Sequence, residues 1–234
     1  MTNEVGAERD EEELIAAATV VLMRDGADGL EVLMLRRNSK LAFGGMWVFP
    51  GGRVDPHELD PANELGSARR AAVREVTEET GLVVDEETLV TWAHWEPPSA
   101  ATMVAGRGPR RRFSTWFFAA RAPEGDVVVD MGEIHEHAWM SPADAIARRQ
   151  EGIIELVPPT WITLWQLSSH RSVADALQHG RGAEPGEFHT RPIGKDPMIL
   201  TWAGDCAYES GDPAAAGPRH RLVMDPAGWR YERD

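Results

Sequence analysis

Three carboxylates crowd into five positions of the segment 74–81, which has the sequence Arg-Glu-Val-Thr-Glu-Glu-Thr-Gly. Residues three and four positions apart share one side of a helix, so Glu75, Glu78 and Glu79 would project together. Like charges at this spacing destabilise an isolated helix by about 0.2–0.5 kcal/mol per pair. The simpler alternative is the solvated face of a surface helix. We favour a metal platform for phosphate chemistry, because Mg²⁺ takes oxygen ligands and keeps positions for water and phosphate.

The surrounding segments predict how these acids are positioned. Residues 49–54, Phe-Pro-Gly-Gly-Arg-Val, follow an apolar run and indicate a strand that ends in a tight turn. Two adjacent glycines let the backbone approach a ligand or an ion closely. Residues 68–73 are mostly strong helix formers, and Gly81 stands where a helix often ends. The predicted unit is a strand, a glycine loop and a helix over 68–80 with the acids in its C-terminal half.

These motifs resemble the signature of the Nudix hydrolase family, Gly-x5-Glu-x7-Arg-Glu-U-x-Glu-Glu-x-Gly-U, in which U is an apolar residue. Residues 74–82 match its second half in full. The first half departs, because Arg74 follows Gly52 by 74 − 52 = 22 positions, about eight more than the signature has. The first Glu of the signature, mainly structural in the family, would fall at Gly66, and Glu64 is the nearest acid. We expect the insertion, 55–66, to be an exposed loop or short helix near the mouth of the cleft.

The resemblance implies a metal-dependent diphosphatase. Its cofactor would be Mg²⁺, with Mn²⁺ as an alternative, and its substrate a nucleoside diphosphate linked to an organic moiety. Glu75 and Glu79 would be the main metal ligands, Glu78 the next, and the Gly52 carbonyl a fourth candidate. Arg74 would orient a carboxylate of the cluster. The alternative function is a catalytically silent Nudix-fold sensor that binds a nucleotide without turnover.

A further acid is expected to come from the segment 131–139. In many Nudix enzymes an acid at this place completes the metal site or acts as the base. Glu133 lies six positions before Trp139 and fits best, with Glu136 second, although a solvated turn acid is equally compatible. The general base is therefore one of the helix glutamates or Glu133.

Arginines are the candidates for binding substrate phosphate, because their guanidinium groups make bidentate contacts with it. Positions 107 and 110–112 hold the densest cationic cluster in an acidic chain. Within it we expect Arg112 to contribute most, since it adjoins a predicted strand over 113–121, and Arg107 to contribute less. Arg37 and Arg53 are the other candidates. A solvated loop is the alternative interpretation of the cluster.

Two segments resemble the long-insert branch of the family, which includes peroxisomal coenzyme A diphosphatases. They are residues 112–118, Arg-Phe-Ser-Thr-Trp-Phe-Phe, and the Pro-Pro-Thr of residues 158–160. The coenzyme A signature itself is only partly met, since Gly45 and Phe49 fit while Leu41 stands in place of an arginine. Coenzyme A derivatives and dinucleotides both stay open as substrates.

The amino-acid composition limits the classes of molecule that the protein is expected to bind. The 234 residues carry a formal net charge of −14, which argues against nucleic acid polymers because no general basic surface can release counterions. Cys206 is the single cysteine, so no intrachain disulfide forms and a cytoplasmic location is expected. The apolar run 14–23 is too short to span a membrane. The expected partner is a small diphosphate molecule, with a homodimer as an option.

The predicted organisation has three parts. Residues 1–13 form a flexible acidic tail, and 14–150 form the α/β domain, a Nudix α/β/α sandwich around a mixed sheet. Residues 151–234 form a C-terminal extension of helix and strands, packed on the domain or forming a dimer surface. Within it we predict one helix from Thr160, as N-cap, to Leu177, an irregular stretch over 180–197, and strands over 198–202 and 220–224.

Overall fold

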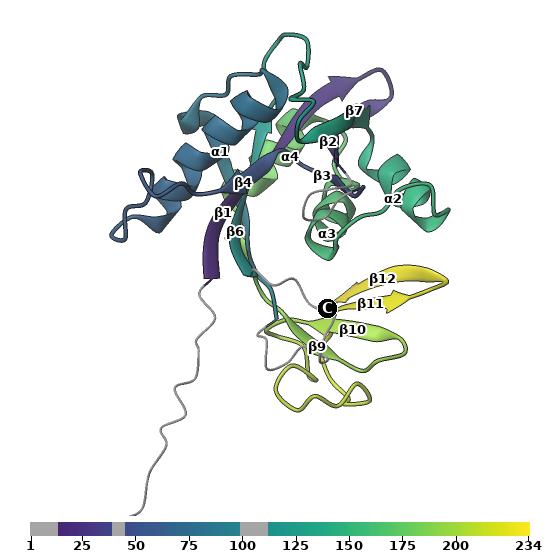
Figure 1. Ribbon diagram of the computed structural model, residues 1–234. Helices are drawn as coiled ribbons and strands as arrows, with labels where there is room; N and C mark the ends of the chain where they lie inside the picture. The colour runs from purple at the N-terminus through teal and green to yellow at the C-terminus, as the bar shows by residue number, and fades with distance from the viewer. Residues whose placement is uncertain (1–13, 39–44, 99–111) are drawn as a thin grey trace, which may run out of the picture.

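The computed structural model of the protein describes residues 14–38, 45–98 and 112–234 (Figure 1). Twelve strands and four α-helices alternate along these residues, with one short 3-10 helix, η1, at Glu86–Thr88. The strands are β1 (Leu14–Gly26), β2 (Gly29–Arg37), β3 (Trp47–Val48), β4 (Gly51–Arg53), β5 (Val90–Glu96), β6 (Arg112–Arg121), β7 (Ile134–Met140), β8 (Gly186–His189), β9 (Arg191–Ile193), β10 (Met198–Thr201), β11 (His220–Asp225) and β12 (Gly228–Arg233). The α-helices are α1 (Glu64–Thr80), α2 (Pro142–Gln150), α3 (Pro158–Leu167) and α4 (Val173–Gly182).

A mixed eight-stranded sheet forms the centre of the molecule. Its strand order is β3-β2-β1-β6-β5-β8, with β4 beside β1 and β7 beside β2. The pairs β1–β6 and β5–β8 are parallel, and the other pairs are antiparallel. This sheet confirms the predicted fold class.

Helices cover both faces of the sheet. Small and apolar residues of α1, among them Ala68, Ala72 and Val76, pack with Val20 and Phe118 of the sheet in one core cluster. Residues of α3 and α4 belong to a second cluster on the opposite face. Alanines on the buried side of α1 let the helix approach the strands closely, so the carboxylates beside them are held near the sheet.

The predicted long helix of the extension is wrong: two helices occupy its place. Ser168 and Ser169 follow α3, and their hydroxyl groups donate to the carbonyls of Trp165 and Gln166 instead of supporting another turn. Ser172 then caps α4. Thr160 is not an N-cap, because it is buried inside the first turn of α3, which begins after Val157 without a side-chain cap.

The predicted irregular stretch 180–197 is also wrong in part. It contains the last turn of α4, β8 and β9, and β8 extends the central sheet beside β5. Strands β9 to β12 form a second, antiparallel sheet, in which β10 and β11 correspond to the two predicted strands. Trp95 of β5 stacks on Phe188 of β8 with ring centroids 3.8 Å apart, and the buried Trp202 meets Phe188 edge-on. One apolar core thus continues from the central sheet into the extension.

No helix among the described residues is long and apolar enough to cross a membrane.

Candidate active site

Helix α1 positions the predicted acids. It begins four residues before the predicted start, because Asn63 caps it by accepting a hydrogen bond of 2.9 Å from the N–H of Gly66. It ends at Gly81, whose φ of 70° is left-handed and whose N–H donates to the carbonyl of Thr77. The predicted helix and its terminal glycine are confirmed.

Five carboxylates line an open cavity of about 270 Å³ at the C-terminal half of α1. Glu75, Glu78 and Glu79 come from the helix, whereas Asp130 and Glu133 come from the turn before β7. The structure therefore brings Glu133 to the helix acids, as predicted. Glu136 instead lies 3.5 Å from Arg36 at the exposed surface. The sequence analysis did not identify Asp130. Its position three residues before Glu133 was the signal that could have pointed to it.

Glu79 is the most buried of these acids, with a side chain only 4% exposed. Its Oε2 accepts a 2.9 Å hydrogen bond from the N–H of Gly51, whereas its buried Oε1 has no hydrogen-bond partner. Burial raises the pKa of Glu79 to about 7, against the Gly51 hydrogen bond and the charge of Arg37. The nearby charges of Glu75 and Glu133 raise it further. A proton or a cation at Oε1 would relieve this arrangement.

Glu75 lies against the glycine loop. A Cβ atom added at Gly52 would collide with the Glu75 carboxylate, so a side chain at this position would displace Glu75 from the glycine loop. Burial raises the pKa of Glu75, although the hydrogen bond and charge of Arg74 oppose the rise. Glu78 is 60% exposed and closes the cavity on its solvent side.

Arg74 holds the acids in place through a partner that the sequence analysis missed. Its Nε and one terminal nitrogen each donate a 3.0 Å hydrogen bond to the carboxylate of Glu58, which is only 7% exposed. Its other terminal nitrogen donates to Glu75 at 2.9 Å and to Glu78 at 3.0 Å. Arg74 therefore orients two acids of the cavity, as the resemblance implied.

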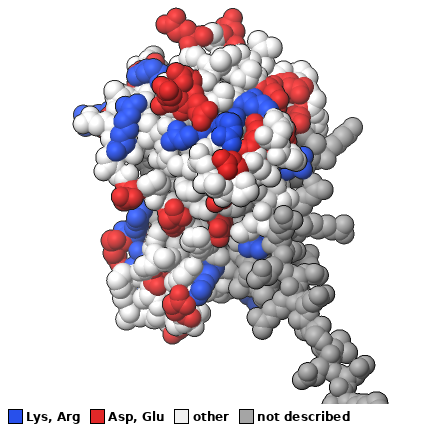
Figure 2. Space-filling view, turned by 90° about the vertical axis from the view of Figure 1, so that its left-hand side faces the viewer, with Lys and Arg blue, Asp and Glu red and all other residues white. Residues whose placement is uncertain are grey.

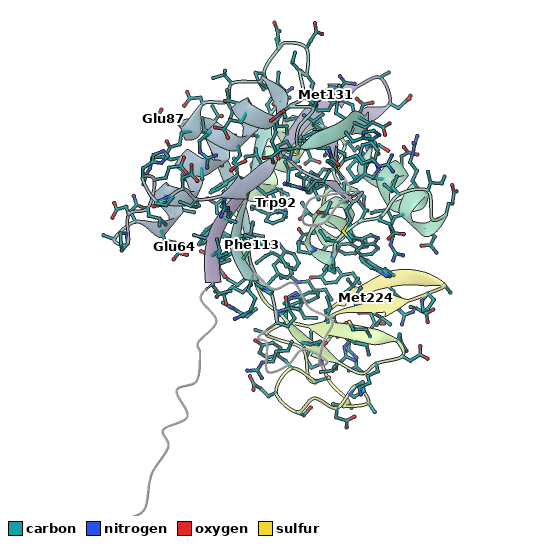
Figure 3. All side chains as sticks on the ribbon, viewed as in Figure 1. Glu64, Glu87, Trp92, Phe113, Met131 and Met224 are labelled. Carbon is teal, nitrogen blue, oxygen red and sulfur yellow. The ribbon has the colours of Figure 1, made fainter. Side chains whose placement is uncertain are left out.

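The buried Glu58 corrects how the signature is aligned with the chain. Glu58 follows Gly52 by six positions, so the Gly-x5-Glu half is intact and the signal was present in the sequence. The additional residues lie between Glu58 and Arg74, and neither Gly66 nor Glu64 takes the place of the first Glu. The insertion is largely exposed, as expected, and none of its residues lines the cavity, although Glu58 near its start holds Arg74. Glu64 precedes Glu75 by eleven positions, which is about 16 Å along a helix, and Figure 3 shows Glu64 well away from Met131, the neighbour of Asp130.

The three predicted phosphate-binding arginines lie in different places. Arg37 is at the cavity, with its guanidinium 3.6 Å from Glu79 and 3.4 Å from Glu133, and its buried Nε has no hydrogen-bond partner. Arg53 is exposed at the end of β4. Arg112 donates to the carbonyls of Pro97 and Pro98, which ties the start of β6 to the end of β5. Positions 107, 110 and 111 lie outside the described residues.

The donor set fits a hard divalent cation. All five side chains of the cavity offer carboxylate oxygens, and Oε1 of Glu79, which lies 3.6 Å from Arg37, has no hydrogen-bond partner. Among the described residues no group of three or more histidines, cysteines, aspartates or glutamates is placed so that it could hold a metal ion without rearrangement. Arg74 and Arg37 lie among these acids. Figure 2 shows acidic and basic side chains mixed over the upper part of the face on the side of α1.

Comparisons with known proteins identify relatives of this chain. An acyl-coenzyme A diphosphatase of Gallus gallus is 30% identical over 151 residues, which cover 56% of this chain and 39% of that protein. A Nudix hydrolase of Alicyclobacillus acidocaldarius superposes with a TM-score of 0.62 at 21% identity, over 72% of this chain and 97% of that one. The Nudix domain of Shewanella oneidensis NrtR, solved with ADP-ribose, superposes with a TM-score of 0.50 at 19% identity, over 68% and 92%.

The chain thus spans well under half the length of the curated relative, whereas it spans nearly all of the two solved structures. The model of the NUDIX domain matches residues 14–158, which includes the glycine loop, α1 and the turn that carries Glu133. These residues are more than half of the chain, and the chain belongs to the Nudix family.

Proposed function

We propose that this protein is a Mg²⁺-dependent hydrolase that cleaves the diphosphate of a nucleoside diphosphate linked to an organic moiety. The observation that carries the proposal is Glu79, a buried carboxylate whose Oε1 has no hydrogen-bond partner inside a cavity of five acids. Arg37 lies 3.6 Å from this oxygen, too far for a hydrogen bond, and a buried acceptor without a hydrogen bond is costly. A divalent ion would pair it and would also attract the phosphates of a substrate.

The roles of the side chains follow from their positions. Glu79 and Glu75 would hold the ion, with Glu78 and the Gly52 carbonyl beside them, and the bound ion supplies positive charge that stabilises the reacting phosphate. Arg74 keeps Glu75 and Glu78 oriented through its anchor on Glu58. The free Nε of Arg37 is a donor for a phosphate oxygen.

The reaction is the attack of water on one phosphorus atom of the diphosphate. A P–O bond to that water forms, the bridging P–O bond breaks, and the water proton passes to a carboxylate. Glu133 suits this role because its side chain is 52% exposed and lines the same cavity. Any of the three helix glutamates is the alternative base.

Acyl-coenzyme A is the substrate class that we favour. The Gallus gallus relative is an acyl-coenzyme A diphosphatase, and the similarity spans 56% of this chain. ADP-ribose is the second class, because the NrtR domain was solved with it. A sensor that binds such a molecule without turnover is the competing function.

A hydrolysis screen tests the proposal. Acyl-coenzyme A, coenzyme A, ADP-ribose and a dinucleotide are each incubated with the protein in Mg²⁺ and in excess chelator. Cleavage of acyl-coenzyme A should release adenosine 3′,5′-bisphosphate and the acyl-phosphopantetheine only with Mg²⁺. Glu79→Gln removes charge without changing shape, and a loss of roughly 10³-fold would correspond to about 4 kcal/mol of transition-state stabilisation.

The matched control is Glu87→Gln in η1, a residue at the exposed surface of the molecule (Figure 3). It should retain full activity. Turnover by Glu79→Gln within a few-fold of the parent would contradict the metal assignment. If calorimetry shows that a diphosphate binds in the presence of Mg²⁺ and no product forms, the result would favour the sensor function.

A further inference from the structure

A second cavity, of about 710 Å³, lies between helix α4 and the end of strand β6. Its lining comes from α4, from the last residue of β6 and the two residues after it, and from Thr88 at the end of η1. It shares no lining residue with the acidic cavity. Its volume falls within the range of roughly 300–1,000 Å³ that is usual for sites of small organic ligands.

One stripe of α4 forms a wall of this cavity. Ser172 caps the helix by accepting a hydrogen bond of 3.2 Å from the N–H of Asp175. Residues that are three, four and seven positions apart lie on one side of a helix. The α4 residues of the lining have this spacing: Ala174, Leu177, Gln178 and Arg181. The stripe therefore supplies two apolar side chains, an amide and a guanidinium group.

The end of β6 forms another wall. The N–H of Ala122 donates a 2.7 Å hydrogen bond to the carbonyl of Met23, and Pro123, which has no N–H, cannot extend the pairing further. The lining residues here are Arg121, Ala122 and Pro123. They add a second guanidinium group and more apolar surface.

Asp25, near the end of β1, holds the two walls together. Its Oδ2 accepts a 2.9 Å hydrogen bond from Nη1 of Arg121. Its Oδ1 accepts one of 2.8 Å from the N–H of Val173, the first residue of α4. One carboxylate thus fixes both the end of β6 and the first turn of α4, so the fold itself sets the separation of the walls before any ligand binds.

The lining carries positive charge, in contrast to the chain as a whole. The chain has a formal net charge of −14, yet among the described residues that line this cavity none is acidic and two are arginines. Arg121 shares its charge with Asp25, whereas the exposed Arg181 forms no hydrogen bond or ion pair within the described chain. A lone exposed arginine is ordinarily just solvated. The second guanidinium group and the apolar lining in the same cavity distinguish this one and favour an anionic organic ligand.

The chemistry of the lining restricts the ligand further. Guanidinium groups bind phosphate bidentately, and a phosphate monoester carries a charge of about −1.5 to −2 at pH 7. Two arginines match this charge better than the single charge of a carboxylate. None of the described lining residues is aromatic, so the cavity offers no ring on which a nucleobase could stack. Its apolar lining is aliphatic, which suits a hydrocarbon chain.

We propose that this cavity binds an aliphatic phosphate monoester. The phosphate pairs with Arg181 and Arg121, and the hydrocarbon part packs on Leu177, Ala174 and Pro123. The site is separate from the acidic cavity, and binding requires no metal ion.

The test is calorimetric binding of hexyl phosphate to the full chain in excess chelator, which keeps divalent ions out of the acidic cavity. The parent should bind one molecule per chain. Arg181→Gln should weaken binding by about tenfold or more, because it removes hydrogen bonds to a charged group. Ala174→Trp, at an exposed helix position, fills the cavity without changing its charge and should abolish binding.

Two further variants serve as controls. Arg171→Gln replaces an exposed arginine just before the N-cap of α4 that does not line the cavity, and it should bind like the parent. Glu79→Gln should also bind like the parent, which separates this site from the proposed hydrolysis. Circular dichroism checks that every variant is folded.

Inorganic phosphate, hexanoate and AMP are the comparison ligands, and each should bind more weakly than hexyl phosphate. They respectively lack the hydrocarbon part, lack the second negative charge and carry a nucleobase. No saturable binding of hexyl phosphate to the parent, or unchanged affinity in folded Arg181→Gln or Ala174→Trp, would overturn the proposal. Hexanoate or AMP binding as tightly as hexyl phosphate would also overturn it, because the ligand class would then be wrong.

Discussion

Glu58 and Arg74 are sixteen residues apart in the chain, yet their side chains share two hydrogen bonds of 3.0 Å. Glu58 also accepts a hydrogen bond from the N–H of Asp55, and Arg74 donates to the carbonyl of Arg53. Burial opposes the charged form of Glu58, but the hydrogen bonds from Arg74 and Asp55 lower its pKa below the ordinary value. This pair links the glycine loop, the start of the insertion and the acidic half of α1 into one rigid support for the cavity.

Replacing Glu58 should therefore destabilise the protein. Glu58→Ala leaves the partly buried Arg74 without its main acceptor, and we expect a loss of about 1–3 kcal/mol in the free energy of unfolding. Glu64→Ala, in the exposed first turn of α1, is the control and should cost less than about 0.5 kcal/mol. Denaturant unfolding measures both losses of free energy, and the dependence of the unfolding free energy on denaturant concentration should be unchanged. Equal losses of unfolding free energy in the two variants would contradict the assignment of Glu58 as the structural first Glu of the signature.

The stability of the metal-free protein should depend on the ionisation of Glu79. Its pKa of about 7 in the folded state lies above the ordinary glutamate value of 4.5. Between these values the folded state keeps a proton that the unfolded state has lost, so stability is highest below pH 4.5 and falls as pH rises to 7. The expected fall due to this group is on the order of 3 kcal/mol. Glu79→Gln should lack this component, and saturating Mg²⁺ should reduce it in the parent; an identical pH profile for parent and variant would contradict the assignment.

Substitutions of Arg37 and Arg112 should affect different properties: the first should reduce catalysis and the second should reduce stability. Arg37→Ala removes the cation beside Glu79 and a free donor at the cavity, so kcat/KM should fall by roughly 10- to 150-fold, equivalent to about 1.5–3 kcal/mol. We expect activity to rise with pH as Glu79 loses its proton. In Arg37→Ala this rise should occur at higher pH, because the charge of Arg37 lowers the pKa of Glu79. Arg112→Ala should mainly reduce the free energy of unfolding, since Arg112 holds two backbone carbonyls. A larger change in KM for Arg112→Ala than for Arg37→Ala would restore Arg112 as the phosphate contact.

The extension should unfold together with the central sheet. Phe188→Ala removes a ring that is 1% exposed and stacked between the two parts, and we expect a loss of about 3–5 kcal/mol with a single unfolding transition. Met198→Ala, at a side chain 38% exposed in β10, should cost far less. Calorimetry would show two transitions if the Nudix domain and the extension were separate folding units. Whether the extension also forms a dimer surface stays a prediction.

The sequence by itself determined the parts of the site that are local. Glu75, Glu78 and Glu79 share a helix face because of the helical repeat, and Gly81 ends that helix because it adopts a left-handed conformation at little cost. The match of residues 74–82 to a known signature needs no tertiary information. The same holds for the Gly52–Glu58 spacing, which keeps the first half of the signature intact.

Only the tertiary structure decided which distant groups meet. It brings Asp130 and Glu133 to the helix acids, places Arg37 at the cavity and Arg112 away from it, and adds β8 to the edge of the central sheet. It also sets the ionisation of Glu79, since burial depends on everything that packs around the side chain. These features depend on pairing between segments far apart in the chain, and local spacing carries no information about such pairing.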